Sequence, residues 1–97
     1  MKLRFTARAI ENITAIAEYI RTDNPAAAPR VRAAIYQGLQ TLIVFPRVGR
    51  KQKTEGIRKL VIPRYGYLIY YSIDEDAEEI VILSIKHPAR EREYEDM

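Results

Sequence analysis

The 97-residue chain contains no cysteine, no tryptophan and a single histidine, His87, and its glycine and proline contents are low, at four and five residues. Without cysteine it can form neither a disulfide framework nor a cysteine-ligated zinc site, and one histidine excludes a paired-histidine metal motif. We therefore expect no metal and no cofactor. Hydrophobic residues make up 47% and charged residues 30%, a balance that excludes a disordered or collagen-like chain. A chain of this length corresponds to one domain, residues 1–97.

Long apolar runs are also missing. Wholly apolar stretches such as 42–45 and 80–83 are only four residues long, whereas a membrane span needs about 20. The first twenty residues include Arg4, Arg8 and Glu11, so no apolar signal-peptide core is expected there. The sequence thus predicts a cytoplasmic protein that does not associate with membranes.

Charge is present but unevenly distributed. Residues 47–64, which we call the basic window, carry seven basic side chains and one acid, a net charge of +6, which leaves −3 for the other 79 residues of a chain whose total is +3. The seven are Arg47, Arg50, Lys51, Lys53, Arg58, Lys59 and Arg64. Residues 74–79 hold five acids in six positions. A basic segment of this kind attracts a polyanion or an acidic protein segment, although a solvated loop gives the same pattern.

The first half of the chain has the pattern of a strand followed by two helices. Residues 2–5 read as a short strand, and Thr6 is placed to cap a helix over 7–21, because its hydroxyl can accept an unpaired backbone N–H. Asn24-Pro25 stops this helix and starts a second one that ends near Val44. Pro29 lacks the N–H that a helical turn needs, so the second helix either kinks or begins properly only near Pro29. A connection this short predicts an antiparallel α-hairpin.

The second half predicts three strands, over 57–62, 67–73 and 79–86, rich in Ile, Val, Leu and Tyr. Their turns are too short for helical crossovers, so the strands must run antiparallel. The order is β-α-α-β-β-β, an α+β fold in which an N-terminal α-hairpin packs on a curved antiparallel sheet. Residues 47–56 are expected to be a basic connector, and 88–97 a charged C-terminal tail.

Three segments carry a family resemblance. The strings FPRVGR at 45–50, EGIRKLVIP at 55–63 and ILSIKHPAR at 82–90 resemble the ParE branch of the RelE/ParE toxin superfamily, as does the Asn24-Pro25 pair between the helices. The likeness extends from the first strand to Arg90. The fold that it implies matches the β-α-α-β-β-β order derived from the pattern.

The resemblance implies the toxin of a type II toxin–antitoxin module, a class linked to plasmid stabilisation. ParE toxins act on DNA gyrase and block replication, whereas RelE toxins cleave mRNA. ParE-type antitoxins are ParD-like ribbon-helix-helix proteins with a flexible segment that folds on the toxin. The partners expected for this chain are therefore such an antitoxin and DNA gyrase. A third interpretation, also kept open, is a degenerate non-toxic binding partner.

The nuclease interpretation needs a proton acceptor, a proton donor and cations in one cleft. The candidates in this sequence are His87, Arg58, Arg90 and Tyr94. In RelE-type nucleases a Gly-Tyr pair like Gly66-Tyr67 precedes an arginine that contacts the scissile phosphate, and here Leu68 follows instead. Because leucine carries no charge, Leu68 favours gyrase inhibition without RNA cleavage. Gyrase inhibition requires no catalytic residues in this chain, so none is assigned. Direct binding of nucleic acid remains a less favoured alternative.

Two sets of binding residues follow. The target-binding candidates are Arg58, Lys86, His87, Arg90 and Arg92, and the antitoxin-binding candidates are Arg50, Lys51, Lys53 and Arg58. Strand alternation places Arg58 on the core side of its strand, where it either pairs with an acid such as Glu55 or Glu79 or projects as a binding group. Four nearby tyrosines are interpreted as sheet packing, with hydroxyls at the rim. They are Tyr65, Tyr67, Tyr70 and Tyr71.

Overall fold

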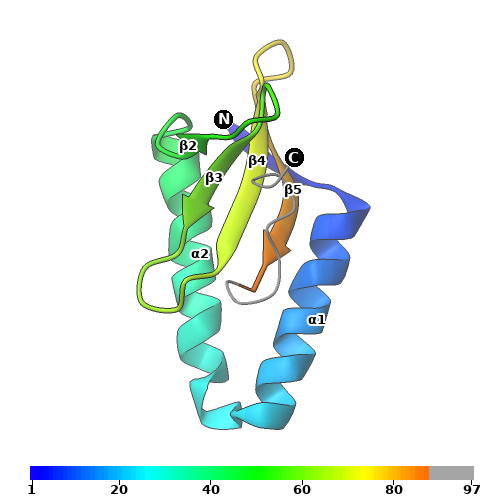
Figure 1. Cartoon of the computed structure of the whole chain (residues 1–97), viewed down its shortest axis with the longest axis vertical. Helices are drawn as coiled ribbons and strands as arrows, with labels where there is room; N and C mark the ends of the chain where they lie inside the picture. Colours follow the sequence, from blue (N-terminus) through cyan, green and yellow to red (C-terminus); the bar gives the residue numbers. More distant parts are fainter. Residues whose placement is uncertain (88–97) are drawn as a thin grey trace.

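The computed structural model of the chain describes residues 1–87 and contains two helices, one 3-10 turn and five strands (Figure 1). In chain order these are β1 (Lys2–Phe5), α1 (Ala7–Asp23), η1 (Pro25–Ala27), α2 (Ala28–Val44), β2 (Arg50–Lys51), β3 (Arg58–Val61), β4 (Leu68–Asp74) and β5 (Glu79–Lys86). The two helices form the predicted antiparallel hairpin, and η1 joins them at one end of the molecule, beyond the strands. Neither helix is long and apolar enough to cross a membrane, as far as residues 1–87 are concerned.

The second helix begins where proline allows it to. After Asn24 the chain makes the single turn η1, and α2 starts at Ala28. Pro29 then lies in the first helical turn, where an N–H has no partner within the helix in any case. The later of the two predicted starts is therefore confirmed, and α1 extends two residues further than expected, to Asp23.

Thr6 joins the start of α1 to the sheet. Its hydroxyl accepts a hydrogen bond from the Ala9 N–H at 3.1 Å, which caps the helix as predicted. The same hydroxyl donates to the Leu83 carbonyl oxygen of β5 at 3.0 Å. One side chain thus sets both the first turn of α1 and its position on β5.

We expect Thr6→Ala to lower the free energy of unfolding by about 1–2 kcal/mol, because both the cap and the bond to Leu83 are lost. Urea denaturation of the two proteins measures this difference. Thr6→Ser keeps the hydroxyl and is the matched control, with an expected loss of less than about 0.5 kcal/mol. Equal losses in the two variants would contradict this role.

The sheet has the strand order β1-β5-β4-β3-β2. Strands β3, β4 and β5 form the predicted antiparallel meander, but β1 pairs parallel with β5, with Leu3 opposite Ile80. The predicted antiparallel pairing thus holds for the three-strand meander, and the parallel β1–β5 pair makes the whole sheet mixed. Short turns dictate antiparallel pairing only between strands that follow one another, whereas β1 and β5 are separated by nearly the whole chain, which leaves parallel pairing open. The expected connector also contains a short strand, β2, antiparallel to β3.

The core lies between the helical hairpin and one face of the sheet. The largest fully buried side chains on this side come from α2, from the strands of the meander and from the turn between β3 and β4. They are Leu42, Ile62, Ile69, Tyr71, Ile80, Ile82 and Ile85. Gly38 lets α2 approach the sheet closely, since a Cβ there would lie 2.3 Å from Ile62 Cδ1. The segment that follows α2 contains β2 and forms the β2 edge of the sheet.

Candidate functional site

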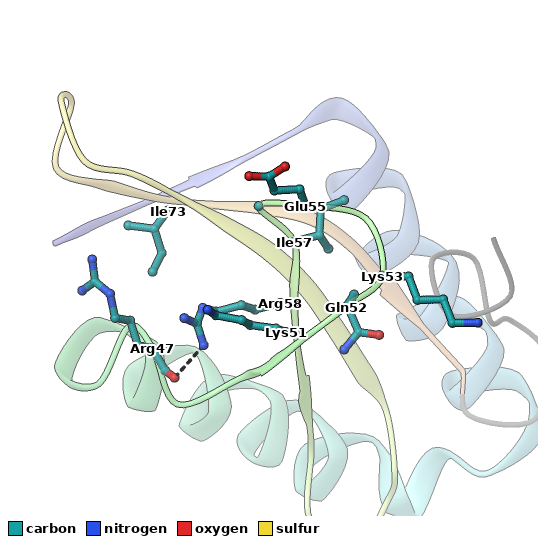
Figure 2. Close-up of a pocket in the computed structure, with 9 residues that line it drawn as sticks. Arg47, Lys51, Gln52, Lys53, Glu55, Ile57, Arg58 and Ile73 are labelled. Carbon is teal, nitrogen blue, oxygen red and sulfur yellow. Dashed lines mark hydrogen bonds between the residues drawn. The ribbon is translucent and has the colours of Figure 1, made fainter.

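A cleft of about 530 Å³ lies at the β2 end of the sheet, and we call it the basic pocket. It is lined by Arg47, Lys51, Gln52, Lys53, Glu55, Gly56, Ile57, Arg58 and Ile73. Figure 2 shows the Lys51 and Arg58 side chains pointing toward Arg47, whereas Lys53 points the other way. Three of the four predicted antitoxin-binding residues thus line one pocket, and Arg50 does not. Arg47, which belongs to the basic window but was not in that set, lines the same pocket.

Arg58 binds backbone rather than a carboxylate. Its Nη1 donates to the carbonyl oxygen of Gly49 at 2.8 Å and to that of Arg47 at 3.0 Å. Glu79, one of the acids suggested as its partner, instead pairs with Arg4 at 2.9 Å. The interpretation of Arg58 as half of an ion pair with Glu79 is therefore wrong. Carbonyl dipoles hold the guanidinium in place without cancelling its charge, so the pocket stays positive.

Tyr71 secures the same loop from the core side. Its hydroxyl donates to the Pro46 carbonyl oxygen at 2.7 Å and accepts from the Gly49 N–H at 2.8 Å. Burial raises the pKa of Tyr71 further above its ordinary value. The neutral phenol can therefore both donate and accept. The prediction of a hydroxyl at the rim is wrong for this tyrosine, because its side chain is fully buried. We call Tyr71, Arg58 and the backbone of 46–49 that they contact the loop clamp.

Gly49 explains part of the FPRVGR string. A Cβ on this residue would lie 2.5 Å from the Tyr71 hydroxyl oxygen and 2.6 Å from the ring carbon Cε1. Only glycine lets the backbone come this close to the ring. The glycine of this string is therefore explained by the contact between the loop and Tyr71. The sequence alone held no separate signal that Tyr71 belongs to the site.

The basic pocket also contacts the acidic turn between β4 and β5. Arg47 forms an ion pair with Glu75, and both side chains are about 60% exposed. An exposed pair of this kind contributes little stability, roughly 0–1 kcal/mol. The pair is weak enough for a stronger acidic ligand to displace Glu75 from Arg47.

The other candidates lie at the end of β5. Lys86 is 9% exposed and pairs in register with Leu68. His87 makes edge-to-face contacts with two rings, Tyr67 at 5.6 Å and Tyr19 at 6.4 Å between centroids. Burial, and then the neighbouring Tyr19, raise the pKa of Tyr67. Three further candidates from the sequence, Arg90, Arg92 and Tyr94, lie outside the described residues.

Arg58 is not brought together with Lys86 and His87. Arg58 pairs with Tyr71, which pairs with Ile82, and Lys86 lies four residues further along β5. Because β5 bulges between these pairs, Lys86 is level with Val61, three residues along β3 from Arg58. Two strand spacings and three residues of strand separate the Cα atoms of Arg58 and Lys86 by roughly 14 Å. Arg58 shares the helix-facing side with its register partner Tyr71, whereas Lys86 is on the opposite face from its core neighbour Ile85. Of the target-binding candidates within residues 1–87, Arg58 and Lys86 therefore lie on opposite faces of the sheet.

Residues 3–92 match the family model described as "ParE toxin of type II toxin-antitoxin system, parDE". This match covers most of the 97 residues, and the chain therefore belongs to the ParE toxin family. A relative from Sinorhizobium fredii (strain NBRC 101917 / NGR234), named "Putative toxin Y4kP", is 36% identical over 86 residues, which are 89% of this chain and 86% of the relative.

Solved structures of toxin–antitoxin proteins have the same fold. The chromosomal ParDE system from P. aeruginosa matches with a TM-score of 0.76 and 23% identity, over 90% of this chain and 95% of that one. The isolated E. coli RelE toxin matches with a TM-score of 0.61 and 15% identity, over 94% of this chain and 87% of that one. ParE and RelE toxins thus share the architecture seen here, and the fold alone does not separate their activities.

Proposed function

We propose that this protein is the toxin of a type II toxin–antitoxin module and that it inhibits DNA gyrase, blocks replication and is neutralised by a cognate ParD-like antitoxin. The observation that carries the proposal is the ParE family match over residues 3–92. A gyrase inhibitor acts where the chromosome is, so the proposed location is the cytoplasm. Antitoxin pairing is supported by the P. aeruginosa structure, which is described as a ParDE system.

The basic pocket is the proposed antitoxin-docking surface. Lys51 and Arg58 converge on Arg47, and charge-assisted hydrogen bonds to carboxylates are stronger than neutral ones. An acidic segment that folds on binding suits such a pocket. Lys53 also lines the pocket, Arg50 precedes Lys51 in β2, and both are proposed to strengthen the attraction. Arg58 has a double role, because it supplies charge and also holds the loop that carries Arg47.

The gyrase-binding surface is proposed to lie at the end of β5. Lys86 and His87 begin it, and Arg90 and Arg92 follow in the sequence. Arg58 lies on the opposite face of the sheet from Lys86, which favours assigning Arg58 to the antitoxin surface alone.

The structure offers less support for the RelE-like alternative. The roughly 14 Å between the strand positions of Arg58 and Lys86 argues against a shared cleft between Arg58 and His87, the residue after Lys86. Leu68, which replaces the nuclease arginine, is 7% exposed and has no charge to offer a phosphate. Gyrase inhibition needs neither an acid nor a base, so these two observations favour it.

Induction of the protein in cells tests the proposal. We expect growth arrest with filamentation and a DNA-damage response, because blocked gyrase leaves broken or unreplicated DNA, while translation continues during the first minutes. Rapid loss of mRNA with intact DNA would support the nuclease alternative instead. Normal growth would favour the non-toxic binding partner. Pulse labelling of protein synthesis beside a DNA-damage reporter distinguishes the three outcomes.

A further inference from the structure

Strand β3 has an outer edge that its neighbour covers only in part. β2 is two residues long and pairs with Arg58 and Lys59 alone, so within residues 1–87 β3 continues through Val61 without an outer neighbour. The Ile62 N–H donates to the Tyr67 carbonyl oxygen at 2.8 Å, which turns Ile62 toward β4. Because hydrogen-bonding directions alternate along a strand, Val61 points its N–H and C=O away from β4, toward the open edge.

A crevice of about 310 Å³ runs beside this edge, between α2 and β3. Gly38 and Ala34 of α2 and Leu60 of β3 are among the residues that line it, and no charged side chain of the described part of the chain does. The Val61 side chain itself is 49% exposed. A strand laid against Val61 would therefore find two backbone hydrogen-bonding groups at its centre and an apolar space for one of its side chains.

Charge indicates what kind of strand fits. Arg50 and Lys59 lie at one end of this edge and Arg64 at the other, and between 58 and 64 the sequence has no acid. A second copy of this chain is disfavoured, because two-fold antiparallel pairing centred on Val61 would set Arg58 of each copy opposite Arg64 of the other. Like charges directly opposite each other destabilise a strand pair. Acidic residues at both ends of the incoming strand are favoured instead.

We propose that the outer edge of β3 at Val61 is a strand-addition site for an extended segment that is apolar at its centre and acidic at its ends. The segment hydrogen-bonds to the Val61 N–H and C=O and places one side chain in the crevice against α2. Its assignment to the antitoxin rests on the function proposed above. The edge continues the line of β2, which borders the basic pocket, so one antitoxin tail can occupy both.

Amide hydrogen exchange followed by NMR tests the proposal on the full chain, alone and in complex with the small protein encoded beside its gene. We expect the Val61 N–H to exchange at least tenfold more slowly in the complex, because strand addition protects it. The internal control is the Leu3 N–H, on the opposite edge of the sheet. The N–H groups of Lys2 and Thr6 donate to Glu78, in the turn before β5, and to Ile82 of β5. Because hydrogen-bonding directions alternate along a strand, the Leu3 N–H points outward. Protection at Leu3 without protection at Val61 would overturn the proposal.

Val61→Pro removes the outward N–H without removing a hydrogen bond from the free protein, and proline is tolerated on edge strands. We expect this variant to fold and its dissociation constant for the same small protein to rise at least tenfold. The matched control is Val61→Thr, which keeps the N–H and the shape and should change binding by less than about twofold. Binding of a folded Val61→Pro variant at the original strength would contradict strand addition. Should the variant not fold, the exchange measurement on the unmodified chain decides.

A synthetic peptide separates this inference from the proposed function. The peptide DEVTVED, added to the isotope-labelled chain, is expected to shift the amide signals of Leu60, Val61 and Ile62, and the charge-reversed KKVTVKK is expected to leave them in place. If the neighbouring gene product forms no complex but DEVTVED shifts these signals, the antitoxin assignment fails and the strand site stands. If a complex forms without protection at Val61, the strand site fails and the antitoxin assignment stands. No response to the gene product or to DEVTVED overturns the strand site.

Discussion

Gly49→Ala is expected to lower the free energy of unfolding by about 3 kcal/mol, a large part of the roughly 5–15 kcal/mol typical of such a domain. A Cβ at 2.5 Å from the Tyr71 hydroxyl oxygen forces the ring and the loop apart. Overpacking costs about 1–3 kcal/mol. The hydroxyl makes one buried bond, with Gly49, and one part-buried bond, with Pro46, and breaking them leaves polar groups unsatisfied and adds about 1–3 kcal/mol.

Urea and thermal denaturation measure this effect, and Gly56→Ala, in the next loop between β2 and β3, is the control. Gly56 has a positive φ of +82°, and a Cβ added there would meet no atom of residues 1–87 within 4 Å. Gly49 has no positive φ, and a Cβ added there would collide with the Tyr71 ring. The control should lose about 1–2 kcal/mol, from backbone strain alone. Tyr71→Phe removes the hydroxyl but keeps the ring, and should lose about 1–3 kcal/mol. A loss at Gly49 no greater than at Gly56 would show that the loop clamp does not exist as described.

Replacing Arg50, Lys51 and Lys53 together with glutamate is expected to weaken antitoxin binding at least 100-fold in low salt. The triple change turns attraction for an acidic segment into repulsion, and like charges across an interface cost several kcal/mol. Salt screens exposed charges, with a Debye length of about 10 Å at 0.1 M. The difference between the variant and the original protein should therefore shrink as salt is raised from about 0.05 to about 0.5 M. Calorimetric titration at both salt concentrations gives this comparison.

The matched control changes the same net charge outside the basic window. Lys2, Arg21 and Arg30 are exposed and are replaced by glutamate in the same way. This control should bind within about threefold of the original protein if the basic pocket is the docking surface. Equal weakening in both variants would show a response to total charge, and unchanged affinity of the basic-window variant would refute the assignment.

Most of the fold was predictable because its signals are local. Thr6, the Asn24-Pro25 pair and Pro29 set the ends of the helices through capping and missing N–H groups, and short turns require the β3–β4–β5 meander. The parallel pairing of β1 with β5 was not predictable in this way, because Leu3 and Ile80 are far apart in the sequence and no short turn fixes their pairing.

The candidate site was predictable in composition but not in geometry. A count of charges located Lys51, Lys53 and Arg58, which do line one pocket. That Arg58 binds the carbonyl oxygens of Arg47 and Gly49 depends on the path of a loop, which side-chain chemistry alone does not specify. Strand alternation placed Arg58 on the correct face, and register then showed that Lys86 is on the other.

A supercoiling assay with purified components tests the central claim most directly. Relaxed plasmid, DNA gyrase and ATP are incubated with increasing amounts of the full-length chain. The proposed function predicts loss of supercoiling once the chain exceeds gyrase, and recovery when the neighbouring gene product is added first. Full supercoiling at a large excess of the chain, together with cleavage of added mRNA, would contradict it.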